Sequence, residues 1–173
     1  MKTTNTTRYE DDFENDIREY ETKELSEKAN NVVLGCAAAA TATGAVPLPF
    51  ADAPLLITEQ VAMMVAINKI FGFDVAKDAL KSLAAMTIGV GGATVLGKTV
   101  ASNLLKMIPG AGTVAGGAIS ASTSGVITLA LGKAYIEVCK AIKMGNLELE
   151  DLSTNKGADM MKKSFKLMLN NKK

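Results

Sequence analysis

Apolar side chains recur at intervals of three and four residues along almost the whole chain, the spacing that places them on one face of an α-helix. The first such segment begins with Phe13, Ile17 and Tyr20 and continues into the alanine-rich run VVLGCAAAATAT, forming one long helix or two. The same spacing predicts four further helical segments. The predicted segments cover about residues 7–43, 52–71, 77–107, 113–144 and 158–169.

Proline, glycine and capping residues mark the ends of these helices. Pro47 and Pro49 hold themselves and the residues before them in extended geometry, so VPLPFADAP cannot continue a helix. Asp52 is well placed to cap the second helix, which we expect to end at Gly72. Gly145 is expected to close the fourth helix in the same way.

Glycines also interrupt the third helix. Gly89, Gly91 and Gly92 fall within four positions, and each costs about 1 kcal/mol in a helix relative to alanine. We therefore expect a kink, a break or a very close helix crossing here. The next turn is predicted at IPGAG, residues 108–112.

These elements predict an all-α fold built from two antiparallel helix hairpins, whose apolar faces are buried in a four-helix arrangement. Residues 1–30 form an acidic amphipathic N-terminal extension, and residues 31–145 a helical bundle domain rich in glycine and alanine. Residues 146–173 form an acidic linker followed by a short basic helix.

Composition excludes several classes of chemistry. The 173 residues contain no histidine, which rules out a Ser-His-Asp triad, a Cys-His pair and a histidine-ligated metal. Nineteen basic and eighteen acidic residues balance to +1, so the chain lacks the basic field of a nucleic-acid-binding protein. Cys36 and Cys139 lie far apart in apolar stretches, and we expect both to be small buried hydrophobic residues.

The charges are concentrated at the two ends of the chain. Residues 1–30 carry nine acidic and five basic side chains, whereas residues 133–173 carry nine lysines and five acidic side chains. Uncharged runs cover residues 31–51 and 107–132, long enough for membrane-spanning helices. Their many small residues lower their hydrophobicity. Composition therefore leaves two readings open, a buried helix in a soluble bundle and a helix hairpin in or on a membrane.

Small residues recur at every fourth position of the fourth helix and leave one face nearly bare of side chains. Such a stripe lets helix backbones approach closely and is a common packing device of helices in lipid. A tight soluble interface uses the same geometry. The predicted positions for helix packing or self-association are Gly112, Gly116, Ser120, Ser124 and Gly132, with Thr128 in the same register.

A match to a nucleotide-binding loop carries little weight. GATVLGKT, residues 92–99, fits the pattern GxxxxGK[ST] letter for letter. That loop must follow a strand and be served by a downstream aspartate, and no acidic residue occurs between Thr99 and Glu137. No nucleophile, general base or metal cluster can be assembled from the remaining residues. We expect no enzymatic activity, cofactor or metal.

The C-terminal segment MMKKSFKLML is a basic amphipathic helix. Met161, Phe165 and Met168 lie on one side, and Lys162, Lys163 and Lys166 on the other. Such a helix is suited to an anionic membrane surface, and Lys162, Lys163, Phe165 and Lys166 are the candidate contacts. The alternative is that the helix folds back onto the bundle.

The stretch GAVPLPFADAPLLITEQVAMMVAINKIFGFD, together with the later IPGAGTVAGGAISASTSGVITLALGKAYIEVC, resembles the bacterial YcjF-type domain of unknown function. The similarity covers about residues 28–145. It implies that Pro47, Pro49, Asp52, Gln60 and Gly72 are motif positions of the family, with no role assigned to them. Domains of this type commonly follow Era-like GTPase domains and are described as membrane-associated. This chain lacks the GTPase.

We therefore expect a non-enzymatic helical module on the cytoplasmic side of a bacterial membrane. It associates with lipid peripherally or through inserted hairpins and acts with a separate GTPase or as a homo-oligomer, without nucleic acid. The alternatives are a soluble cytoplasmic helical scaffold or oligomer, and a bundle that inserts conditionally to form a pore.

Overall fold

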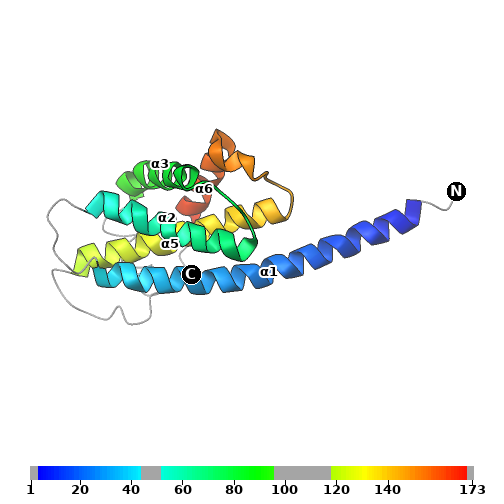
Figure 1. Cartoon of the computed structure of the whole chain (residues 1–173), viewed down its shortest axis with the longest axis horizontal. Helices are drawn as coiled ribbons and strands as arrows, with labels where there is room; N and C mark the ends of the chain where they lie inside the picture. Colours follow the sequence, from blue (N-terminus) through cyan, green and yellow to red (C-terminus); the bar gives the residue numbers. More distant parts are fainter. Residues whose placement is uncertain (1–3, 44–51, 96–117, 171–173) are drawn as a thin grey trace.

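The computed structural model describes residues 4–43, 52–95 and 118–170, and side chains within 9–42, 57–88 and 124–170. Every regular element in these ranges is helical. They are α1 (Thr4–Thr43), α2 (Asp52–Phe71), α3 (Lys77–Val95), α5 (Ala118–Lys143), the 3₁₀ helix η2 (Glu150–Ser153) and α6 (Asn155–Asn170). The predicted all-α class is confirmed, with the helices packed against one another in a bundle (Figure 1).

The centre of the bundle is α5. This helix is mostly apolar, as expected of a helix surrounded by others, and α1, α2, α3 and α6 all pack on it. Its fully buried side chains are Val126, Leu129, Ala130, Leu131, Ala134, Tyr135, Val138 and Cys139. Cys139 is thus buried as expected, whereas Cys36 is only half-buried.

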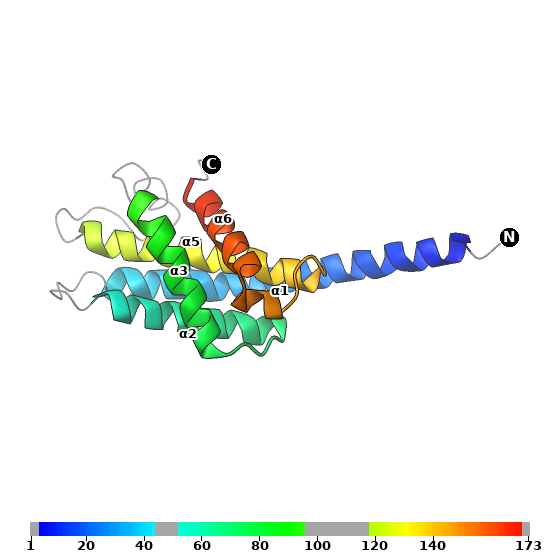
Figure 2. The same cartoon turned by 90° about the horizontal axis from the view of Figure 1, so that it is seen from above.

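A single helix of 40 residues, α1, forms the long edge of the molecule. Its second half packs on α5 and α2 through Ala29, Val33, Ala37 and Ala40, whose small side chains let the helices approach closely. Its first half projects beyond the bundle (Figures 1 and 2). The expected boundary at residue 30 falls inside this helix.

Glycines end two helices where the sequence predicts it. Gly72 follows α2 with φ 75°, and Gly145 follows α5 with φ 73°, a backbone conformation that glycine adopts at little cost. The Phe73 amide donates to the Asn68 carbonyl at 2.9 Å, and the Asn146 amide to the Ala141 carbonyl at 2.8 Å. Both ends are Schellman motifs, which satisfy carbonyl groups left free by the helix.

Two details differ from expectation. The glycines at positions 89, 91 and 92 do not break α3, which continues to Val95. Helix propensity is a weak determinant beside tertiary packing, and α3 packs on α2 and α6. Second, α6 starts at Asn155 rather than near Ala158, because Thr154 caps it: the Thr154 hydroxyl accepts a hydrogen bond from the Lys156 amide at 3.2 Å.

Candidate functional site

Two buried hydrogen bonds join α2 to α5 inside the bundle. The Gln60 side-chain Nε2 donates to the Thr128 hydroxyl at 2.7 Å, and both residues are buried. Two turns further along α2, the Tyr135 hydroxyl donates to the Asn68 side-chain Oδ1, also at 2.7 Å. Such pairs fix how the two helices align, because a shift of one turn would bury these polar groups without partners.

Each pair leaves one polar atom unsatisfied. Gln60 Oε1 and Asn68 Nδ2 are buried and have no hydrogen-bond partner among the described residues. Burial also raises the pKa of the Tyr135 phenol and of the Cys139 thiol one turn further along α5. Both groups therefore stay neutral at ordinary pH, and neither is activated as a nucleophile.

Gly132, a position of the small-residue stripe, lies very close to both α1 and α2. A Cβ at this position would lie 2.6 Å from both Cγ atoms of Val33 on α1 and 3.0 Å from the Met63 sulfur on α2. Thr128, one turn earlier, is the buried partner of Gln60. At these two positions the stripe is used within one chain, to pack α5 against α1 and α2.

The other predicted stripe and motif positions are described only in part. Gly112, Gly116, Pro47 and Pro49 lie outside the described residues. Ser120 and Asp52 lie in α5 and α2, but their side chains are not described. Ser124 is half-buried. Of the family-motif residues, Gln60 and Gly72 thus have visible roles, and both are structural.

The C-terminal helix folds back onto the bundle, so the second of its two expected placements is the one observed. It packs on α5, α3 and η2. Phe165, expected at a membrane surface, is only 1% exposed and belongs to the hydrophobic core with Met161 and Leu169. That expectation is corrected, because the bundle already buries the apolar face on which Phe165 lies.

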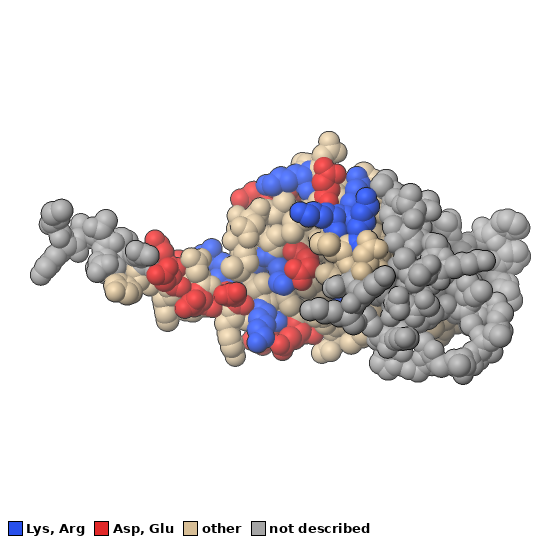
Figure 3. Space-filling view, turned by 180° about the vertical axis from the view of Figure 1, so that it is seen from behind, with Lys and Arg blue, Asp and Glu red and all other residues tan. Residues whose placement is uncertain are grey.

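The polar side of α6 remains on the surface. We call Lys162, Lys163 and Lys166 the lysine face. Lys163 and Lys166 are exposed, while Lys162 is half-buried and lies 3.6 Å from the Asp159 carboxylate. Leu167, beside them in sequence, is 58% exposed. Figure 3 shows lysines gathered on this side of the bundle and acidic side chains along the projecting helix.

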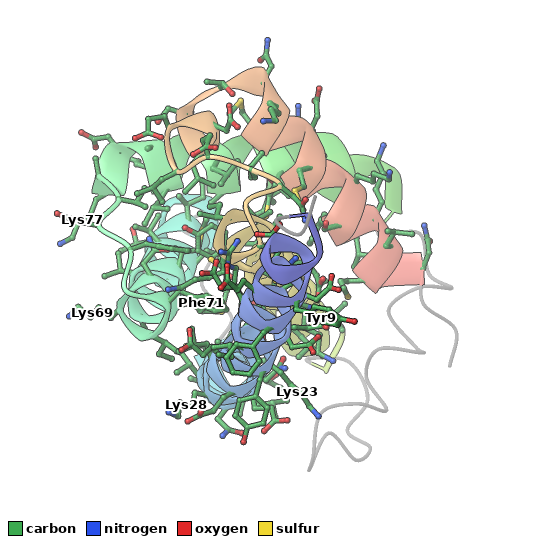
Figure 4. All side chains as sticks on the ribbon, turned by 90° about the vertical axis from the view of Figure 1, so that its right-hand side faces the viewer. Tyr9, Lys23, Lys28, Lys69, Phe71 and Lys77 are labelled. Carbon is green, nitrogen blue, oxygen red and sulfur yellow. The ribbon has the colours of Figure 1, made fainter. Side chains whose placement is uncertain are left out.

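Sequence reasoning missed the second surface, on the projecting part of α1. Every side chain from Tyr9 to Glu21 is exposed, a segment we call the arm. Tyr9, Phe13, Ile17 and Tyr20 therefore form a largely exposed apolar stripe. Figure 4 looks along α1 from its free end, with Tyr9 labelled on the part of the helix nearest the viewer. The amphipathic pattern was visible in the sequence, but not that its apolar side is uncovered.

The described residues contain no group of three or more Cys, Asp or Glu side chains that could hold a metal ion. The motif GATVLGKT begins inside α3, since Gly92 to Val95 are helical, so at least its first half is not the loop that cradles a phosphate. Within the same described ranges, no helix is both long and apolar enough to cross a bilayer.

Comparison with known families shows to which family the chain belongs. A family model, the domain of unknown function DUF697, matches residues 8–163. The chain belongs to this family. The match includes the whole arm and the first part of α6, with Lys162 and Lys163 of the lysine face, whereas Lys166 lies beyond it. No curated protein and no solved structure matches the chain significantly.

Proposed function

We propose that this DUF697 domain is a non-enzymatic, membrane-associated helical module that lies on an anionic membrane surface through its lysine face. The observation that carries the proposal is the exposure of Lys163 and Lys166 beside the exposed Leu167. Each lysine near an anionic membrane contributes about 1 kcal/mol of attraction. The apolar side of α6 stays in the core, so attachment is mainly electrostatic.

Liposome flotation tests this function. The protein should float with vesicles of phosphatidylglycerol and phosphatidylethanolamine at about 0.05 M salt and be released at about 0.5 M, because salt screens surface attraction. The variant Lys163→Glu/Lys166→Glu should bind at least about thirtyfold more weakly, because it removes two attractive charges and adds two repulsive ones. The control Lys23→Glu/Lys28→Glu makes the same charge change on α1 and should float like the wild type.

Three results would contradict the membrane proposal. Absence of flotation at low salt would favour the soluble scaffold. Flotation that resists high salt would favour inserted hairpins, including the pore-forming alternative. Equal loss in both charge-reversal variants would show that net charge alone, and not the lysine face, controls binding.

The proposal also includes a partner, a separate Era-like GTPase. Its support is the resemblance to YcjF-type domains, which commonly follow such a GTPase in one chain. Sedimentation of this protein with the purified Era-like GTPase of the same organism, loaded with GDP or with a GTP analogue, tests it. Co-sedimentation in either state supports the partnership, and its absence in both states contradicts it.

A further inference from the structure

The apolar stripe of the arm faces away from the surface that α1 uses to pack on its own bundle. Tyr20 is 73% exposed, whereas Thr22, two residues later, is 3% exposed. Two residues turn a helix by about 200°, so these side chains point in nearly opposite directions. Tyr9, Phe13 and Tyr20 lie on the same side of the helix at spacings of four and seven residues. The bundle of the same chain therefore does not cover the stripe.

Charge restricts what can cover it. Nine carboxylates and four basic side chains lie in α1, and the arm holds most of the carboxylates. An anionic lipid surface repels such a helix. Direct pairing of two arms brings like charges together, which is also unfavourable. The suitable surface is apolar with a positive rim.

The bundle carries such a surface between α2 and α3. A groove of about 410 Å³ is lined by the apolar side chains Ile57, Val61 and Val65 of α2. Across it stand the exposed Lys77 and Lys81 of α3, with one carboxylate, Asp78, between them in sequence. The charged lining of the groove is thus two lysines and one carboxylate, so the groove is weakly positive where the arm is negative.

We propose that the arm of one copy docks its aromatic stripe into the α2–α3 groove of a second copy, and that two copies exchange arms reciprocally. An amphipathic helix bound in an apolar groove through side chains about one turn apart is a common recognition mode. Lys77 and Lys81 then face the carboxylates that flank the stripe, such as Glu10 and Asp16. When two copies exchange arms reciprocally, both grooves are filled and assembly stops at a dimer. If each arm docked onto a different copy, assembly would continue into rings or filaments.

The area is sufficient for a dimer. Aromatic side chains bury about 150–250 Å² each, so the exposed parts of the four stripe residues contribute roughly 500 Å² per arm. Two arms and the grooves they cover approach the range of about 1,200–2,000 Å² found in stable interfaces.

Sedimentation equilibrium of the full chain without lipid tests the contact first. We expect a concentration-dependent dimer, with a dissociation constant raised about a hundredfold by Phe13→Ser, since each dimer loses two buried aromatic rings. Leu34→Ser is the matched control, because Leu34 is an exposed apolar residue of α1 outside the arm. It should dimerise like the wild type. A wild-type chain that stays monomeric at every concentration overturns the proposal, and an equal effect of both variants does the same.

Charge-reversal variants test whether the α2–α3 groove is the surface that binds the arm. Lys77→Glu/Lys81→Glu should weaken the dimer about tenfold, and Glu10→Lys/Asp16→Lys should weaken it similarly. The variant with all four changes should recover most of the wild-type affinity, because opposite charges again face each other. All six positions changed in these variants are exposed, so circular dichroism should show unchanged helicity. If the variant with all four changes does not recover its dimer affinity, the arm binds elsewhere and this contact is refuted.

Discussion

Replacing Gly132 with leucine is expected to lower the free energy of unfolding by about 3 kcal/mol. The α-carbon of Gly132 lies so close to α1 that even a Cβ would come within 2.6 Å of both Val33 methyl groups. Val33 is fully buried and β-branched, so its side chain cannot turn aside freely. The larger leucine side chain must push α5 away from α1, which opens the core along the contact.

Urea denaturation followed by circular dichroism measures this loss. Gly35→Leu is the matched control, because Gly35 lies in α1, is exposed and has nothing within 4 Å of the position a Cβ would take. Leucine has the higher helix propensity, so this control should be as stable as the wild type or slightly more stable. Equal unfolding midpoints for the two variants would show that the helices do not depend on close contact at Gly132.

Local chemistry is what the sequence predicts well. Gly72 and Gly145 were predicted to end helices, and both do so in the left-handed conformation that glycine favours. The start of α2 at Asp52 also follows from short-range spacing, whereas the spacing left open whether the first segment is one helix or two. These features depend on a few neighbouring residues, whose preferences are independent of the rest of the fold.

Features decided by distant residues could not be predicted in the same way. The pattern of α6 is equally suited to a core and to a membrane, and only the surfaces of α3 and α5 decide that Phe165 is buried. The bond between Gln60 and Thr128 joins residues 68 positions apart, and no local spacing indicates it. For the arm the sequence does hold a sign: Phe13, Ile17 and Tyr20 lie on one side of the helix, whereas Leu25, Ala29 and Val33 lie on nearly the opposite side.

The pair of Tyr135 and Asn68 should be worth more together than either residue alone. Within the described part of the chain, Tyr135→Phe removes the one hydrogen bond that the Asn68 side chain makes, since its Nδ2 already has no partner there. A buried amide with no partner costs about 1–3 kcal/mol, so this variant should lose that much stability. Tyr20→Phe is the matched control, since Tyr20 is exposed on the arm, and should change stability by less than about 0.5 kcal/mol.

A double-mutant cycle separates the bond from the bulk of the side chains. Asn68→Leu leaves the Tyr135 hydroxyl buried without its acceptor, and we expect a loss similar to that of Tyr135→Phe. The double variant Asn68→Leu/Tyr135→Phe buries neither polar group, so it should lose less than the sum of the two single variants, with a coupling energy of about 0.5–3 kcal/mol. Additive losses would mean that the hydroxyl and the amide do not stabilise each other. In that case the register of α2 against α5 would be set by apolar packing around Met63 and Ile67 rather than by the polar pairs.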